Sequence, residues 1–169
     1  MNQTTKAMKK LALILFLIPS LALSQDSLEL KTINDLNKYR ASKGLSQLVI
    51  DQGLCKAAEH QVKYEFLCDS VTHGQYQDFP DFQEIPEFED RIRHFCGPDG
   101  PSPQSEITLG GGKRNSIEII EWFKMSPGHD RAMTDKNIQK VGIEVVINKE
   151  YVKNGKKEMR FYCVIVFGI

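Results

Sequence analysis

Two stretches in the N-terminal half place apolar residues three or four positions apart, the spacing that lines one face of a helix. Gly44 follows the first stretch and suits the left-handed residue that closes a helix, while Asp51 precedes the second stretch as an N-cap. We therefore predict two consecutive helices. Their apolar stripes are Leu30, Ile33, Leu36 and Tyr39 in the first, and Leu54, Ala58, Val62 and Phe66 in the second.

The last third of the chain has the pattern of a β-hairpin. Runs rich in β-formers at 141–152 and 158–167 flank Asn154-Gly155, a pair that strongly favours a two-residue hairpin turn. Both faces of these runs are apolar at the end away from the turn, so the strands need cover on two sides. The expected fold is therefore of the α/β class, a three-layer α-β-α sandwich with the C-terminal antiparallel hairpin in its central sheet.

Loops and two short helices make up the middle of the chain. Residues 69–86 are polar and aromatic and contain two prolines, so we predict a long loop that carries His73. A short helix at 87–95 gives way to a Gly/Pro-rich loop, and Asn115-Ser116 starts an apolar helix that reaches Met125. We expect the aromatic rings of the long loop to pack on the core; the alternative is a surface that sets specificity.

The first 24 residues have the pattern of a secretory signal peptide. Three lysines precede an apolar run at 11–23, and Ala22-Leu23-Ser24 fits a cleavage site. The run is shorter than the roughly 20 residues that span a membrane, so we expect no transmembrane anchor after cleavage. The remaining residues, 25–169, have the size of a single domain, which we expect to be secreted or periplasmic.

Charge narrows the classes of partner. The chain has 22 basic and 22 acidic side chains, and removing residues 1–24 takes away three lysines and no acid, which leaves 19 against 22. A slightly acidic domain of this kind gives no reason to expect nucleic acid or an anionic membrane surface as a partner.

All four cysteines, Cys55, Cys68, Cys96 and Cys163, lie in the part expected to be exported, where an oxidising compartment favours disulfides. Four cysteines allow three pairings, and the sequence does not choose among them. A Cys55–Cys68 bridge is disfavoured because 13 positions along one helix separate the two residues by about 20 Å. Their spacings match no zinc-binding pattern, so we expect structural bridges or buried thiols.

A break between two helices places a histidine at a distinctive position. Ser126 follows the apolar helix as an N-cap and Pro127 suits the first position of the next helix, so His129 is the third residue of that helix. The positive end of the helix dipole disfavours the imidazolium there. A neutral imidazole can bind a metal ion or a hydrogen-bonding ligand; the alternative is simple packing against the preceding helix end.

Five blocks of this sequence form a recognisable set: "LNKYRASKGLSQLVID", the alanine-containing helix from Leu54, "THG", "IIEWFKMSPGHDRAMTDKNIQKVGIEVV" and "VIVFGI". Together they resemble the CAP (SCP-like) superfamily of cysteine-rich secretory, antigen 5 and pathogenesis-related proteins, in its compact bacterial form. The segment from Trp122 to Gly142, with its W-x-x-x-S-P-G-H pattern, is the most specific of them. The resemblance covers nearly the whole mature length and implies an α-β-α sandwich of CAP type.

The resemblance also implies three cavity residues. His73 in "VTHGQ" matches a loop histidine of the family, Glu106 in "SEI" matches the glutamate of its G-E-N motif, and His129 is the S-P-G-H histidine. The family's second glutamate, just past the tryptophan, has no counterpart because residues 124–126 contain no acid, and Glu121 is only a weak substitute.

Three functions are open at this point. The resemblance and the incomplete acid set favour a secreted, non-catalytic binding module for a lipid, glycan or protein partner. The alternative is a metal-assisted hydrolase, in which His73 and His129 bind a divalent ion such as zinc and Glu106 is the general base. That reaction is short of carboxylates, because Glu106 can hardly be both ligand and base. A third possibility is an exported structural protein without a ligand.

Overall fold

The computed structural model describes residues 27–75, 79–82 and 84–169, so the signal peptide expected at 1–24 lies outside the described residues. The helices are α1 (Leu28–Ser42), α2 (Gln52–Cys68), α3 (Phe88–Cys96), α4 (Ser116–Lys124) and α5 (Pro127–Met133), with a 3-10 turn at Pro80–Phe82. The strands are β1 (Val49–Ile50), β2 (Pro103–Gly112), β3 (Lys140–Lys153) and β4 (Lys156–Gly168).

The strands form one sheet in the order β1-β3-β4-β2. β1 runs parallel to β3, and the other neighbours are antiparallel. The expected hairpin of β3 and β4 is confirmed, and its turn residues Asn154 and Gly155 have the positive φ angles of 51° and 74° that such a turn needs. β2 lies at an edge of the sheet, which leaves one side of this strand without a partner strand among the described residues.

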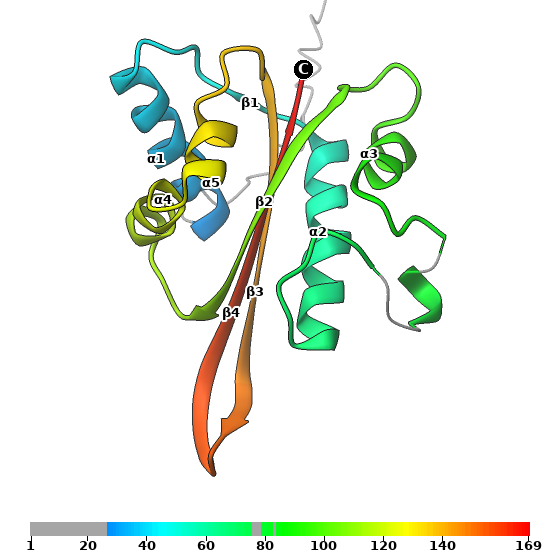
Figure 1. The fold of residues 1–169 in the computed structure, drawn as a ribbon, viewed down its shortest axis with the longest axis vertical. Helices are drawn as coiled ribbons and strands as arrows, with labels where there is room; N and C mark the ends of the chain where they lie inside the picture. Colours follow the sequence, from blue (N-terminus) through cyan, green and yellow to red (C-terminus); the bar gives the residue numbers. More distant parts are fainter. Residues whose placement is uncertain (1–26, 76–78, 83) are drawn as a thin grey trace, which may run out of the picture.

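Helices cover both faces of the sheet, so the three-layer architecture is confirmed (Figure 1). α2 and α3 lie on one face, and α1, α4 and α5 lie on the other. Alternate residues of β4 supply the two cores: Tyr162, Val164 and Val166 face α2, whereas Phe161, Cys163, Ile165 and Phe167 face α1 and α4. The strands are apolar on both faces because each face is buried.

The close approach of α2 to β3 depends on a glycine. A Cβ at Gly142 would lie 2.1 Å from the backbone carbonyl carbon of Leu54 and 2.3 Å from the nitrogen of Cys55. Only a residue without a side chain allows the first turn of α2 to rest on the strand at this point. Asp51 starts that turn as predicted, since its side chain accepts a hydrogen bond from the Leu54 nitrogen.

β2 was not predicted, because its glycine-rich end resembles a loop. It nevertheless pairs with β4 from Ser105 to Gly112. Gly110 has a specific role there: a Cβ would lie 2.6 Å from Cγ2 of Val71. The glycine therefore lets the segment after α2 cross the strand, and that segment carries His73.

The described residues, which include every cysteine, form no disulfide, so of the two outcomes expected for the cysteines, bridges or thiols, the structure shows thiols. All four cysteines are free thiols in this structure. Cys163 is fully buried in the core on the α1 side of the sheet, whereas Cys55, Cys68 and Cys96 belong to the α2 and α3 layer on the other side. The sheet thus separates Cys163 from the other three sulfurs.

No helix within the described residues is both long and apolar enough to cross a membrane.

Candidate functional site

His73 and Glu106 come together at the edge of the sheet. The loop after α2 carries His73 over β2, and Glu106 projects from β2 toward the same side. Nδ1 of His73 lies 3.1 Å from Oε1 of Glu106, and the exposed fractions of the two side chains are 57% and 2%. The hydrogen bond to Glu106 raises the pKa of His73, which favours an imidazolium anchored on a buried carboxylate.

Arg91 holds both of these residues in place. Its Nη2 donates to Oε2 and Oε1 of Glu106 at 3.0 and 3.2 Å, and to the carbonyl oxygen of His73 at 3.0 Å. Nη1 donates to the carbonyl oxygen of Pro86 at 2.7 Å. The Arg91 side chain is 1% exposed, so the ion pair with Glu106 is almost fully removed from water. The negative charge of Glu106 is therefore already balanced by Arg91.

A second buried acid, Glu65 of α2, lies beside this ion pair. The Thr108 hydroxyl is 2.7 Å from both of its carboxyl oxygens, and the Thr72 nitrogen donates to Oε1 at 3.1 Å. Burial raises the pKa of Glu65 to about 7, and the charge of Glu106 adds to this shift. The Thr108 hydroxyl has one proton to donate, so a protonated Glu65 would donate the second hydrogen bond back to that hydroxyl, in agreement with the raised pKa.

His129 occupies the predicted position, the third residue of α5, although Ser126 makes no side-chain cap hydrogen bond. Its ring packs edge-on against Phe123 at 5.2 Å and lies 5.9 Å from the ring of Trp122. Nδ1 of His129 is buried without a hydrogen-bond partner. Because the protein covers Nδ1, the packing alternative describes this side of the ring, and a ligand would have to use Nε2.

Two long-range contacts fix the short helix that carries His129. The Tyr39 hydroxyl donates to Asp130 at 2.6 Å, and the fully buried Arg40 donates to the carbonyl oxygens of Met133 and Asp135 at 2.8 and 2.9 Å. α1 therefore holds α5 at its centre and at its C-terminal end, and α5 is too short to be stable alone.

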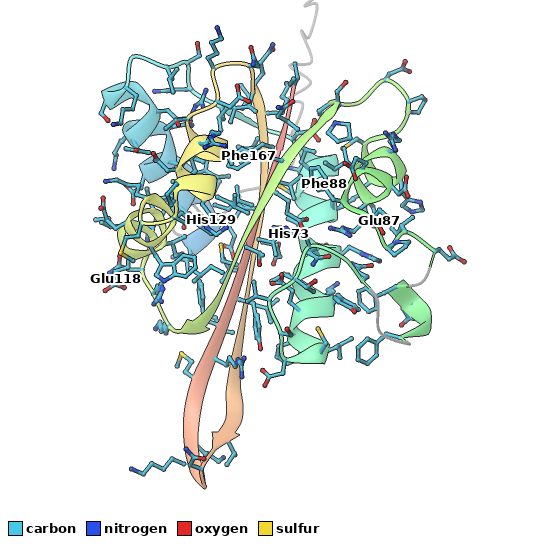
Figure 2. The ribbon with its side chains drawn as sticks, viewed as in Figure 1. His73, Glu87, Phe88, Glu118, His129 and Phe167 are labelled. Carbon is cyan, nitrogen blue, oxygen red and sulfur yellow. The ribbon has the colours of Figure 1, made fainter. Side chains whose placement is uncertain are left out.

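The two histidines lie on either side of β2 (Figure 2). Burial lowers the pKa of His129, and the charge of His73 lowers it further. The prediction of a neutral imidazole agrees with this direction, although the main cause is burial and not the helix dipole. The environment of His73 therefore favours the charged imidazolium, whereas that of His129 favours the neutral imidazole.

The residues present do not fit a metal centre in which Glu106 joins His73 and His129 as a third ligand. Within the described ranges, no three histidine, cysteine, aspartate or glutamate side chains converge so as to hold a metal ion. Glu106 accepts hydrogen bonds from Arg91 on both oxygens, which leaves it unsuited to coordination. His73 and His129 alone would supply only two protein ligands, fewer than a catalytic zinc site needs.

Sequence reasoning missed Arg91 and Glu65. Both lie on helices, at positions whose spacing places them on the apolar face. Arg91 lies between Phe88 and Phe95 on α3, and Glu65 continues the apolar stripe of α2 beyond Ala58. A charged residue on an apolar stripe was the signal that could have found them. Glu121, the weak substitute, is exposed and pairs with Lys124 at 2.7 Å.

One comparison with known proteins identifies a family, and two solved structures share the fold. The model of the CAP family, the cysteine-rich secretory protein family, matches residues 33–167. An outer surface protein of Borrelia burgdorferi is 15% identical with a TM-score of 0.58, over 80% of this chain and 88% of that one. An extracellular SCP-domain protein of Bacillus anthracis is 14% identical with a TM-score of 0.60, over 84% and 40%. None of the curated proteins matches the sequence.

Proposed function

This chain belongs to the cysteine-rich secretory protein (CAP) family, and from that premise we propose that it is an exported binding module without catalytic activity. The observation that carries the proposal is the ion pair of Arg91 and Glu106. A general base must present a free carboxylate oxygen to the substrate or to water, whereas both oxygens of Glu106 accept hydrogen bonds from the buried guanidinium of Arg91. Glu106 instead orients His73 toward solvent.

The two histidines are the proposed contact residues. An imidazolium at His73 donates hydrogen bonds, and a neutral imidazole at His129 can accept one. A donor at His73 and an acceptor at His129 suit a partner rich in hydroxyl or amide groups. Among the expected partners, a glycan or an extracellular protein fits this chemistry better than the acyl chain of a lipid.

Export is supported by the N-terminal pattern and by the similar structures, which are those of an outer surface protein and an extracellular protein. We propose that residues 1–24 are removed as a signal peptide and that 25–169 act as one domain, secreted or periplasmic.

Zinc titration separates this proposal from a metal-assisted hydrolase. Calorimetry on residues 25–169 should give no stoichiometric zinc complex that depends on the two histidines, and p-nitrophenyl acetate should be cleaved no faster than by the His73→Ala/His129→Ala variant. One zinc per chain in the wild type, lost in that variant together with ester cleavage, would overturn the proposal.

Binding is tested with immobilised glycans. The wild type and the His94→Ala control, which changes an exposed histidine of α3, should give the same glycan signals, and the His73→Ala/His129→Ala variant should lose them. Signals that survive in the double variant would place recognition elsewhere on the molecule.

A further inference from the structure

A groove beside α4 lies outside the histidine site and has no role so far. It consists of two adjoining hollows, of about 370 and 540 Å³, which share Lys113, Arg114 and Glu118. The first extends along α4 to Trp122 and Met125, and the second reaches α1. We refer to both together as the α4 groove. Figure 2 shows Glu118 on the outward side of α4, away from the sheet.

The acids of the α4 groove already have partners. Glu118 closes the capping box of α4, because its Oε2 accepts a hydrogen bond from the Asn115 nitrogen at 2.8 Å. Oε1 of Glu121 accepts one from Lys124 at 2.7 Å. Their charges are thus partly offset by groups that belong to α4 itself.

The bases of the α4 groove are in the opposite situation. Within the described ranges, neither Lys113 nor Arg114 forms an ion pair or a hydrogen bond, and Nε of Arg114 is buried without an acceptor. Arg114 is held by packing, with its guanidinium carbon 5.9 Å from the centre of the Trp122 ring. Its hydrogen-bonding capacity is unused, and an arginine next to a lysine is well suited to a carboxylate or sulfate.

Apolar surface next to these bases indicates a second property of the ligand, a face that can pack on an aromatic ring. Trp122 is only partly buried, and Met125 is 74% exposed. The hollows are open to solvent and edged by charges, which does not suit an acyl chain that needs enclosure. A sugar ring, with an apolar face and a rim of hydroxyl groups, can lie on an indole and donate to carboxylates such as Glu118 and Glu121.

We propose that the α4 groove binds an acidic saccharide, with the carboxylate or sulfate at Lys113 and Arg114 and a sugar ring on Trp122. This inference rests on the proposed function, because it names a ligand class for the same binding module. The groove adjoins the histidine site through Trp122, whose ring lies 5.9 Å from that of His129. A saccharide of several units could contact both surfaces.

Tryptophan fluorescence tests the proposal directly, because Trp122 is the single tryptophan of the chain. A hyaluronan hexasaccharide, which carries carboxylates, and a heparin hexasaccharide, which also carries sulfates, are titrated against maltohexaose, which is neutral. At least one acidic probe should change the emission in a saturable and salt-sensitive way, and maltohexaose should not. The probe that binds more tightly shows whether the site prefers a carboxylate or a sulfate.

The variant Lys113→Met/Arg114→Met should weaken this binding by about tenfold or more, since it removes both charged donors. The control Lys56→Met/Lys136→Met loses the same charge from exposed positions away from the groove and should bind like the wild type. If the first variant misfolds by circular dichroism, Lys113→Glu, which changes only an exposed side chain, should produce the same direction of effect.

Two results would overturn the inference. One is that no acidic probe changes the emission, and the other is that both double variants weaken binding equally, which would indicate general charge attraction. If Lys113→Met/Arg114→Met binds normally and His73→Ala/His129→Ala does not, the α4 groove is excluded and the proposed function stands. If the histidine variant alone binds normally, the groove is supported independently of the histidine site.

Discussion

At the residue scale, Glu65 is the side chain with the clearest physical consequence. Its carboxyl has a pKa near 7 in the fold against 4.5 as a free group, so the folded state holds a proton that the unfolded state releases between these values. The contribution of Glu65 to stability is therefore greatest below pH 4.5 and is lost as the pH rises from about 4.5 through 7. The raised pKa of His73 acts in the same direction.

The variant Glu65→Gln should remove much of this pH dependence, because the amide imitates the protonated carboxyl. The wild type should lose up to about 3 kcal/mol more than the variant between pH 5 and pH 8. Urea unfolding at the two pH values measures the difference. Glu89→Gln, an exposed acid on α3, is the control and should follow the wild type. Parallel profiles for Glu65→Gln and the wild type would contradict the assignment.

Part of the site could be predicted from single residues. The motif contexts of His73, Glu106 and His129 were enough to propose them, and the structure brings His73 and Glu106 into contact. Arg91 could not be predicted as the partner of Glu106, because 15 positions of helix, loop and strand separate them and only the tertiary fold brings them together. Sequence patterns also treat a charged helix residue as solvent-exposed, and this expectation fails where a buried acid lies opposite it.

At the scale of elements, the helices and the hairpin were predictable because each has local signals. Asn115 caps α4, Asp51 caps α2, and Asn154-Gly155 makes the turn. β2 and β1 lacked such signals: β2 ends in three glycines, and β1 has only two residues. Both owe their existence to pairing with strands that are distant in sequence, which no local pattern encodes.

The packing of α2 on β3 gives a prediction for one glycine. Gly142→Ala should destabilise the fold by about 3 kcal/mol or more, because the new methyl group would overlap the backbone of α2 and neither element can move freely. Urea unfolding measures the loss. Gly128→Ala on α5 meets no atom within 4 Å and should be neutral or slightly stabilising. Equal stability of both variants would mean that α2 does not approach β3 so closely.

At the scale of the whole molecule, two apolar cores hold the sandwich together without a covalent cross-link. A reducing agent should therefore leave the melting temperature of residues 25–169 unchanged within about 1 °C, whereas loss of a structural disulfide would lower it by several degrees. Alkylation in denaturant without reductant should modify four cysteines. Two or no modified cysteines, with a melting temperature that falls on reduction, would show that bridges form after all.

Because Cys163 is enclosed, its reaction with a thiol reagent reports how often the fold opens. Its sulfur is fully buried in the middle of β4, so a thiol reagent can reach it only while the layers are apart. Cys68, near the surface at the end of α2, is available far more often. Under native conditions and in one sample, the ratio of the Cys163 labelling rate to the Cys68 labelling rate then measures how often the whole sandwich opens.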